Sequence, residues 1–197
     1  MTLKENITTQ TVTSVSAKVL IVGDSGVGKT ALLIRLQDEA FQLTASTHGA
    51  SLSHIEVPRD LINDESSRDI TRELELWDLA GQPRFESVRA GFYRGARGGL
   101  LLYDVTRRRT FLNVDNWKEE AFKNLTYKIP LILVANKVDL EDSRVVTTEE
   151  GEKYAKKNKM MYVESSALTG ENVEEAYANL CRTMIESSKN SAQTKSL

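Results

Sequence analysis

A glycine-rich octapeptide stands near the start of the chain, between an apolar run and a helical pattern. It covers residues 23–30 with the sequence GDSGVGKT, and the apolar run 19–22 directly precedes it. Glycines at this spacing let the backbone curl so that successive N–H groups point at phosphate oxygens, and the N-terminus of the following helix adds partial positive charge. The pattern predicts a phosphate-binding loop in preference to an ordinary glycine-rich turn.

Two side chains at the end of this loop suit a triphosphate bound with magnesium. Lys29 is expected to reach the β- and γ-phosphates, and the Thr30 hydroxyl is expected to bind Mg²⁺. The rest of the predicted phosphate site comes from the loop and from the helical residue that follows it: Asp24, Ser25, Gly26, Val27, Gly28 and Ala31. This loop by itself is compatible with ATP as well as GTP.

A second polar motif, Asn136-Lys137-Val138-Asp139, addresses the choice of base. It follows the apolar run 131–135. A carboxylate at Asp139 can accept hydrogen bonds from both guanine N1–H and the guanine 2-amino group, whereas adenine has no matching pair of donors. Asn136 is expected to bond to neighbouring loops or to the base, and the aliphatic stem of Lys137 to lie along the base plane. The motif favours guanine.

Two other segments supply candidates for contacts with the base. Ser166, Ala167 and Leu168 follow the last apolar run, and the backbone N–H of Ala167 can donate to guanine O6. Phe41 is a candidate to cover the edge of the base, with a place in the core as an equal alternative.

A third motif, Asp78-Leu79-Ala80-Gly81-Gln82, follows an apolar run that ends at Trp77. A carboxylate at this end of a strand is placed for Mg²⁺ or its water shell, so Asp78 is the predicted metal-site carboxylate. Gly81 allows its N–H to approach a γ-phosphate closely, and Gln82 is the candidate that orients an attacking water. The alternative is a strand-capping Asp beside a surface Gln.

A parallel sheet would bring these motifs together. Short apolar runs alternate with helical stripes, which is typical of an α/β fold with helices on both faces of the sheet. Ligands then bind beyond the carboxyl ends of the strands, where all three motifs lie. The runs predict strands at 19–22, 74–77, 99–103, 131–135 and 160–163, helices from Lys29, across 111–125 and across 173–184, and an exposed hairpin connection at 58–72.

Composition limits the class of protein. The 197 residues include 26 Lys and Arg against 28 Asp and Glu, for a net charge of −2, so no nucleic acid is predicted as a partner. A single cysteine, Cys181, cannot form an intrachain disulfide and is expected in the core of the last helix. The apolar runs are far shorter than a membrane-spanning helix. A cytoplasmic monomer is predicted. One domain is predicted over 17–186, between flexible ends at 1–16 and 187–197.

Taken together, the chain resembles a small GTPase of the Ras superfamily over about residues 17–186, and the stretches between the motifs resemble its Rab branch. Those stretches are QPRFES at 82–87, FYRGA at 92–96, LYDVT at 102–106, Thr110-Phe111 and Asn116-Trp117. The resemblance implies a three-layer P-loop NTPase fold with a six-stranded, mostly parallel sheet. It also implies a GTP/GDP switch that slowly hydrolyses GTP, with Gln82, Thr47 and Lys29 as the catalytic residues.

The resemblance adds Thr47 to the predicted metal ligands Thr30 and Asp78. It implies effector proteins, an exchange factor and a GTPase-activating protein that bind the switch segments, and a role in vesicle traffic. The chain departs from the family pattern at several positions, which are His48, Ala50-Ser51-Leu52, Leu79 and Leu168. Since no cysteine follows Cys181, no prenyl anchor is expected, and recruitment to endomembranes would depend on protein partners.

Three interpretations remain open at this point. A hydrolysing GTP switch is preferred, a hydrolysis-deficient GTP-binding scaffold is the alternative, and an ATP-using kinase is a weaker third. The basic run 107–109 is expected to keep a loop exposed to solvent. Tyr103 and Asp104, just before it, are expected to have structural roles.

Overall fold

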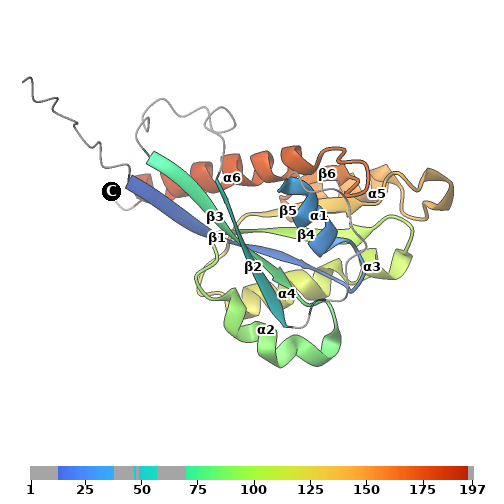
Figure 1. The fold of residues 1–197 in the computed structure, drawn as a ribbon, viewed down its shortest axis with the longest axis horizontal. Helices are drawn as coiled ribbons and strands as arrows, with labels where there is room; N and C mark the ends of the chain where they lie inside the picture. The colour runs from blue at the N-terminus through green and yellow to red at the C-terminus, as the bar shows by residue number, and fades with distance from the viewer. Residues whose placement is uncertain (1–12, 38–46, 48, 57–69, 195–197) are drawn as a thin grey trace, which may run out of the picture.

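One six-stranded sheet forms the middle layer of the molecule (Figure 1). The computed structural model describes residues 13–37, 47, 49–56 and 70–194. The strand order is β2-β3-β1-β4-β5-β6, and every neighbouring pair is parallel except β2 with β3. The strands are β1 (Thr13–Gly23), β2 (Ala50–Glu56), β3 (Ile70–Leu79), β4 (Gly98–Asp104), β5 (Leu131–Asn136) and β6 (Met161–Ser165).

Helices cover both faces of this sheet, with α1 and α6 on one side and α2 and α4 on the other (Figure 1). The α-helices are α1 (Lys29–Leu36), α2 (Glu86–Tyr93), α3 (Arg108–Leu112), α4 (Val114–Asn124), α5 (Thr148–Asn158) and α6 (Val173–Thr194). Two short 3₁₀ turns, η3 (Pro83–Phe85) and η4 (Glu141–Ser143), complete the described elements. The predicted three-layer α/β fold of the P-loop NTPase type is confirmed.

Alternation along β1 shows why the sheet is buried on both faces. Val19 and Ile21 pack in the cluster that contains α1 and α6, whereas Leu20 and Val22 pack in the cluster that contains α2, α4 and α5. All four side chains are buried. A strand between two helical layers needs apolar residues at every position, which is why it reads as a continuous apolar run. Cys181 is buried in the first cluster, as predicted.

The strand order reverses at β1, which lies between β3 and β4. In open α/β sheets, ligands bind at the carboxyl ends of the strands beside such a reversal. The register places Asp78 of β3 opposite Ile21 of β1, Asp104 of β4 opposite Asn136 of β5, and Asn136 opposite Ser165 of β6. All these polar residues therefore stand at one edge of the sheet.

The structure differs from the sequence-based prediction at both ends of the domain. The sequence predicts a flexible leader that includes residues 13–16, whereas these residues form the first part of β1 and pair with β3 from Ile70 onward. Residues 187–194 were assigned to a flexible tail, but they continue α6. This segment has no Gly or Pro to stop a helix, so polarity alone was a poor sign of its end.

Three further boundaries also differ. The helix predicted across 111–125 is two helices, α3 and α4, which meet at Asn113. Asp78 lies inside β3 instead of following it. Of the predicted hairpin connection at 58–72, residues 70–72 belong to β3, and the remainder lies outside the described residues. Within the described part of the chain, no helix combines the length and apolar character needed to cross a bilayer.

Candidate functional site

The glycine-rich segment forms a tight loop between β1 and α1. Gly28, the residue before the helix, has φ 101°, and a Cβ at this position would stand 2.2 Å from Asn136 Nδ2. Neither the backbone conformation nor the space there accepts another residue type. The loop is therefore held against the end of β5, where the Asn136 motif begins.

Lys29 lies inside the curve of this loop. Its Nζ donates to the backbone oxygens of Gly23 and Asp24, at 2.8 and 2.9 Å, and the side chain is 6% exposed. Burial lowers the pKa of Lys29 to about 8, against the opposing effect of the Asp78 and Asp24 carboxylates. The ammonium group thus stands in the loop that was predicted to hold phosphates, while its contact with phosphate remains a prediction.

The three predicted metal ligands come together beside Lys29. Thr30 Oγ1 donates to Asp78 Oδ2 at 2.5 Å, Thr47 Oγ1 donates to the same oxygen at 3.0 Å, and the two hydroxyl oxygens are 3.0 Å apart. They come from α1, from the segment before β2 and from β3. Residues distant in sequence are therefore within reach of one ion.

The chemistry of this group fits Mg²⁺. Asp78 is fully buried, and its Oδ1 has no hydrogen-bond partner among the described residues. Burial raises the pKa of Asp78, opposed by the hydrogen bonds from Thr30 and Thr47 and by the charge of Lys29. A buried carboxylate with an unsatisfied oxygen beside two hydroxyls offers the oxygen ligands that Mg²⁺ prefers. No group of three His, Cys, Asp or Glu side chains forms another metal site in the described residues.

The predicted base-binding residues also meet. Ser166 Oγ donates to Asp139 Oδ1 at 2.5 Å, which fixes the carboxylate. Asn136 is buried, and its Nδ2 donates to the Val27 carbonyl at 2.7 Å. The Ala167 N–H donates to Asn136 Oδ1 at 3.1 Å, so guanine O6 would have to share this donor. Of the two roles considered for Asn136, the structure has the contact with neighbouring loops.

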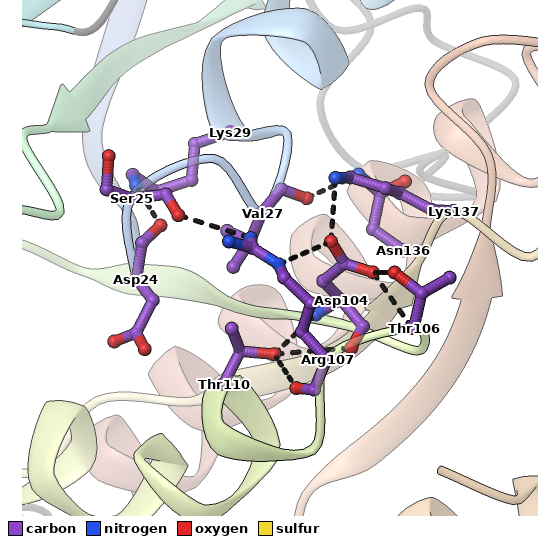
Figure 2. Close-up of polar contacts among 10 residues, drawn as sticks. All are labelled: Asp24, Ser25, Val27, Lys29, Asp104, Thr106, Arg107, Thr110, Asn136 and Lys137. Atoms are coloured by element: carbon purple, nitrogen blue, oxygen red, sulfur yellow. Dashed lines mark hydrogen bonds and ion pairs between the residues drawn. The ribbon is translucent and has the colours of Figure 1, made fainter. Parts of the chain in front are cut away.

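The other residues predicted to contact the base differ in how the structure places them. Lys137 has φ 71°, and its Nζ pairs with Asp104 Oδ2 at 2.6 Å (Figure 2). The ammonium group is therefore directed to β4, and the stem remains the part predicted to lie along a base. Leu168 is 49% exposed next to Ala167. Phe41 and His48 lie outside the described residues.

The segment after β3 packs directly on the phosphate loop. A Cβ added to Gly81 would stand 2.4 Å from both Asp24 C and Ser25 N, so only glycine permits this approach. The Ala80 N–H donates to the Gly49 carbonyl at 2.8 Å, which joins this segment to the one that carries Thr47. Gln82 stands next to the contact, and its role in orienting water remains a prediction.

Sequence reasoning missed several polar residues of this site. The carboxylate of Asp24 accepts hydrogen bonds from Trp117 Nε1 at 2.7 Å and from Asn113 Nδ2 at 2.8 Å. Arg107, assigned to a solvated loop, donates to Asp104 and to the Ser25 carbonyl (Figure 2). The available signal was the position of Asp104 at the carboxyl end of an apolar run, the same edge that holds the other motifs.

In a comparison with protein families, the sequence model of the Ras family matches residues 18–186. The matched range contains the phosphate loop, the Thr30, Thr47 and Asp78 group, and both guanine segments. Ras-family proteins in general bind GTP and GDP with Mg²⁺ and act as switches that regulators and effectors recognise. Because the match spans most of the chain and agrees with the fold and the motifs, the protein belongs to the Ras family of small GTP-binding switch proteins.

Proposed function

We propose that this protein is a Rab-like switch that binds GTP and GDP and slowly hydrolyses GTP to GDP and phosphate. The observation that carries the proposal is the meeting of Thr30, Thr47 and Asp78 beside the buried Lys29. Asn136 connects this phosphate end to the base end through the Val27 carbonyl. A nucleotide that spans the two ends would contact residues from segments that are far apart in the sequence.

Each group has a chemical task in this proposal. Asp139 accepts the two donors of guanine, and the backbone of the phosphate loop binds phosphate oxygens. Lys29 offsets charge on the β- and γ-phosphates. Thr30, Thr47 and Asp78 would hold Mg²⁺, which would supply positive charge that stabilises the phosphates. Gln82 orients the water that attacks the terminal phosphorus.

Two arginines whose charges act on Lys29 are engaged with carboxylates. Arg89 donates to both carboxylate oxygens of Glu120, and Arg107 donates to Asp104. An activating protein that supplies a further arginine would raise the rate by about 10³ to 10⁵. The proposal therefore expects slow intrinsic hydrolysis that such a partner would accelerate.

The Rab-like part of the proposal rests on the strings QPRFES, FYRGA and LYDVT and on Asn116-Trp117. It assigns the protein to vesicle traffic, with effectors and an exchange factor that bind the segments around Thr47 and Gln82, and recruitment to endomembranes by protein partners. Affinity capture with Gln82→Leu loaded with a non-hydrolysable GTP analogue tests it. Partners recovered only in that state and unrelated to vesicle traffic would contradict it.

Hydrolysis is tested by Gln82→Leu, with Gln37→Leu as the matched control because Gln37 is exposed at the end of α1. Both variants should bind GTP like the wild type. Single-turnover phosphate release should slow by about tenfold or more for Gln82→Leu alone, because the attacking water loses its orienting amide. Equal release from all three proteins would remove Gln82 from the mechanism.

A GTP-binding scaffold without hydrolysis is the second candidate. It is favoured by the first switch, where Ala50-Ser51-Leu52 departs from the family pattern. Purified wild-type protein separates the two, because a scaffold would retain GTP without measurable single-turnover cleavage. Competition of ATP against labelled GTP tests the third interpretation, an ATP-using enzyme, and Asp139 should prevent that competition.

A further inference from the structure

Arg107 connects two loops that are far apart in the sequence. It precedes α3, and its Nε donates to Asp104 Oδ2 at 2.8 Å while its Nη2 donates to the Ser25 carbonyl at 3.2 Å (Figure 2). The side chain is 44% exposed, whereas Asp104 is completely buried. One guanidinium group therefore joins the end of β4 to the phosphate loop.

Asp104 extends this connection to the guanine loop, which is the segment 136–139 predicted to bind the base. The same Oδ2 that accepts from Arg107 also accepts from Lys137 Nζ at 2.6 Å. Its other oxygen accepts from the Thr106 N–H at 2.9 Å and from Thr106 Oγ1 at 2.6 Å. Burial by itself raises the pKa of Asp104, but the bonds from Lys137 and Thr106 outweigh it and hold the pKa below its ordinary value. The shared carboxylate is therefore charged at neutral pH.

The position of Arg107 is fixed by its own turn. Thr110 Oγ1 donates to the Arg107 carbonyl at 2.8 Å and contacts the Asp104 carbonyl at 3.2 Å. A Cβ added to Gly26 would stand 3.5 and 3.6 Å from the two terminal nitrogens of Arg107, which is van der Waals contact. The guanidinium group thus lies on the outer surface of the loop whose inner surface is occupied by Lys29.

We propose that Arg107 is a positioning residue that slows the release of guanine nucleotide by tying the phosphate loop to the guanine loop through Asp104 and Lys137. The inference rests on the proposed function, because it requires that both loops hold one nucleotide. Release of that ligand requires the two loops to move apart. Each hydrogen bond or ion pair between them that must break makes this movement slower. Arg107 touches no predicted ligand atom and acts through Ser25 and Asp104.

An arginine suits this position because of its fork. The planar guanidinium carries several N–H donors, so Nε donates to the carboxylate while Nη2 donates to the carbonyl. A lysine has one nitrogen at the end of a flexible stem, so it keeps the charge but cannot hold both acceptors in the same geometry. Comparing arginine with lysine at position 107 therefore distinguishes the effect of the two hydrogen bonds from a general effect of positive charge.

The experiment measures the release of fluorescently labelled GDP in excess unlabelled GDP and Mg²⁺. Arg107→Met retains most of the apolar stem and loses both donors, and Arg107→Lys retains the charge. Arg109→Met is the control, because Arg109 is an exposed residue of α3 and its loss changes the net charge equally. Release should be about three- to tenfold faster for Arg107→Met, intermediate for Arg107→Lys and unchanged for Arg109→Met.

A second readout distinguishes positioning from a purely structural role. The rise in unfolding temperature caused by GDP should be smaller in Arg107→Met than in the wild type, because weaker nucleotide binding stabilises the fold less. An equal drop in unfolding temperature with and without GDP, at an unchanged release rate, would make Arg107 structural and overturn the inference. Wild-type release by Arg107→Met would overturn it as well. Failure of wild-type protein to bind GDP would instead overturn the proposed function, and the inference with it.

Discussion

A hydrogen bond from one neighbour, Ser166, orients the carboxylate of Asp139. Ser166, which is fully buried, donates to Oδ1 at 2.5 Å and so sets the plane of the carboxylate. A carboxylate has about four acceptor positions, and one hydroxyl leaves the others for a ligand. Two adjacent N–H donors on a base could both bond to this carboxylate, which is the chemical basis for predicting guanine over adenine.

Replacing Asp139 by Asn should change the preferred base. The amide can no longer accept from both guanine donors, so affinity for GDP should fall by about a hundredfold or more. Its NH₂ group can donate to the 2-oxo group of xanthine, so xanthosine diphosphate should now bind better than GDP. Competition against a fluorescent nucleotide measures both affinities. Asp142→Asn, in the exposed turn η4, is the control, and unchanged GDP preference in Asp139→Asn would refute the assignment.

Gly81 sets the distance between two motifs, so a single methyl group there should be costly. In Gly81→Ala the new Cβ would meet backbone atoms of Asp24 and Ser25 at 2.4 Å, and backbone cannot swing aside as a side chain can. The free energy of unfolding should fall by about 1–3 kcal/mol. Urea denaturation checks this value.

The matched control for that substitution is Gly91→Ala. Gly91 lies in α2, and apart from its chain neighbours and the nearby backbone of its own helix, no atom lies within 4 Å of an added Cβ. Alanine is a better helix former than glycine, so this variant should gain about 0.5–1 kcal/mol. Two glycine substitutions of opposite sign would show that close approach, and not glycine content, governs the effect. A Gly81→Ala variant as stable as the wild type would contradict the contact.

At the scale of elements, the sequence predicted those strands and loops whose signal is local. The octapeptide at 23–30 and the motif that begins at Asn136 each carry their whole pattern within a few residues, and both stand where predicted. The start of β1 could not be predicted, because residues 13–16 become a strand only by pairing with β3. The link from Arg107 to Ser25 was missed for the same reason, since 82 positions separate these residues.

Helix α2 contributes a buried arginine that fixes the segment after β3. Arg89 Nη1 donates to the carbonyls of Ala80 and Gln82, at 2.9 and 2.8 Å, on either side of Gly81. Its Nε and Nη2 bond both oxygens of Glu120 in α4, at 2.8 and 2.7 Å. The backbone around Gly81 is therefore held from the helical layer as well as from the phosphate loop.

Removing this arginine should destabilise the protein strongly. Arg89→Ala leaves Glu120, which is only 16% exposed at its side chain, without its charged partner. Breaking such a pair from one side costs about 3–5 kcal/mol, because an uncompensated charge stays buried. Urea denaturation should show this loss, while Arg94→Ala, exposed after the end of α2, should change stability by less than about 0.5 kcal/mol. Similar losses in the two variants would mean that the Arg89 cluster contributes little.

Across the whole molecule, the site joins the two helical layers. The phosphate loop packs on α1 and also reaches α4, because Asp24 accepts from Trp117 Nε1 at 2.7 Å. Arg89 of α2 stands over the ring of the same Trp117, 4.5 Å from its centroid. A rearrangement of the phosphate loop therefore has a physical route to α4 and α2, and hence to the backbone on either side of Gly81.

Carboxylates with lowered pKa values make the stability of the folded protein sensitive to acid. Several carboxylates accept hydrogen bonds from protein donors that favour their charged form, and their pKa values lie below the ordinary range. These carboxylates are Asp104, Asp115, Glu149, Glu150 and Glu164. The unfolded chain then binds more protons than the folded protein once the pH approaches the ordinary values of 3.8 and 4.5. Their contribution to stability is complete above about pH 5 and is lost as the pH falls through the lowered values.

Substitution of Glu164 tests the predicted loss of stability as the pH falls. Burial raises the pKa of Glu164, but the hydrogen bonds from Arg144 and Thr148 outweigh it and lower the pKa. Glu164→Gln removes one titrating group, so the free energy of unfolding should start lower at pH 7 and fall less steeply between pH 5 and pH 3 than in the wild type. Urea denaturation at half-unit steps of pH gives both slopes. Glu152→Gln, exposed on α5, should parallel the wild type, and a Glu164→Gln curve that also runs parallel would show that this carboxylate is not held by its partners.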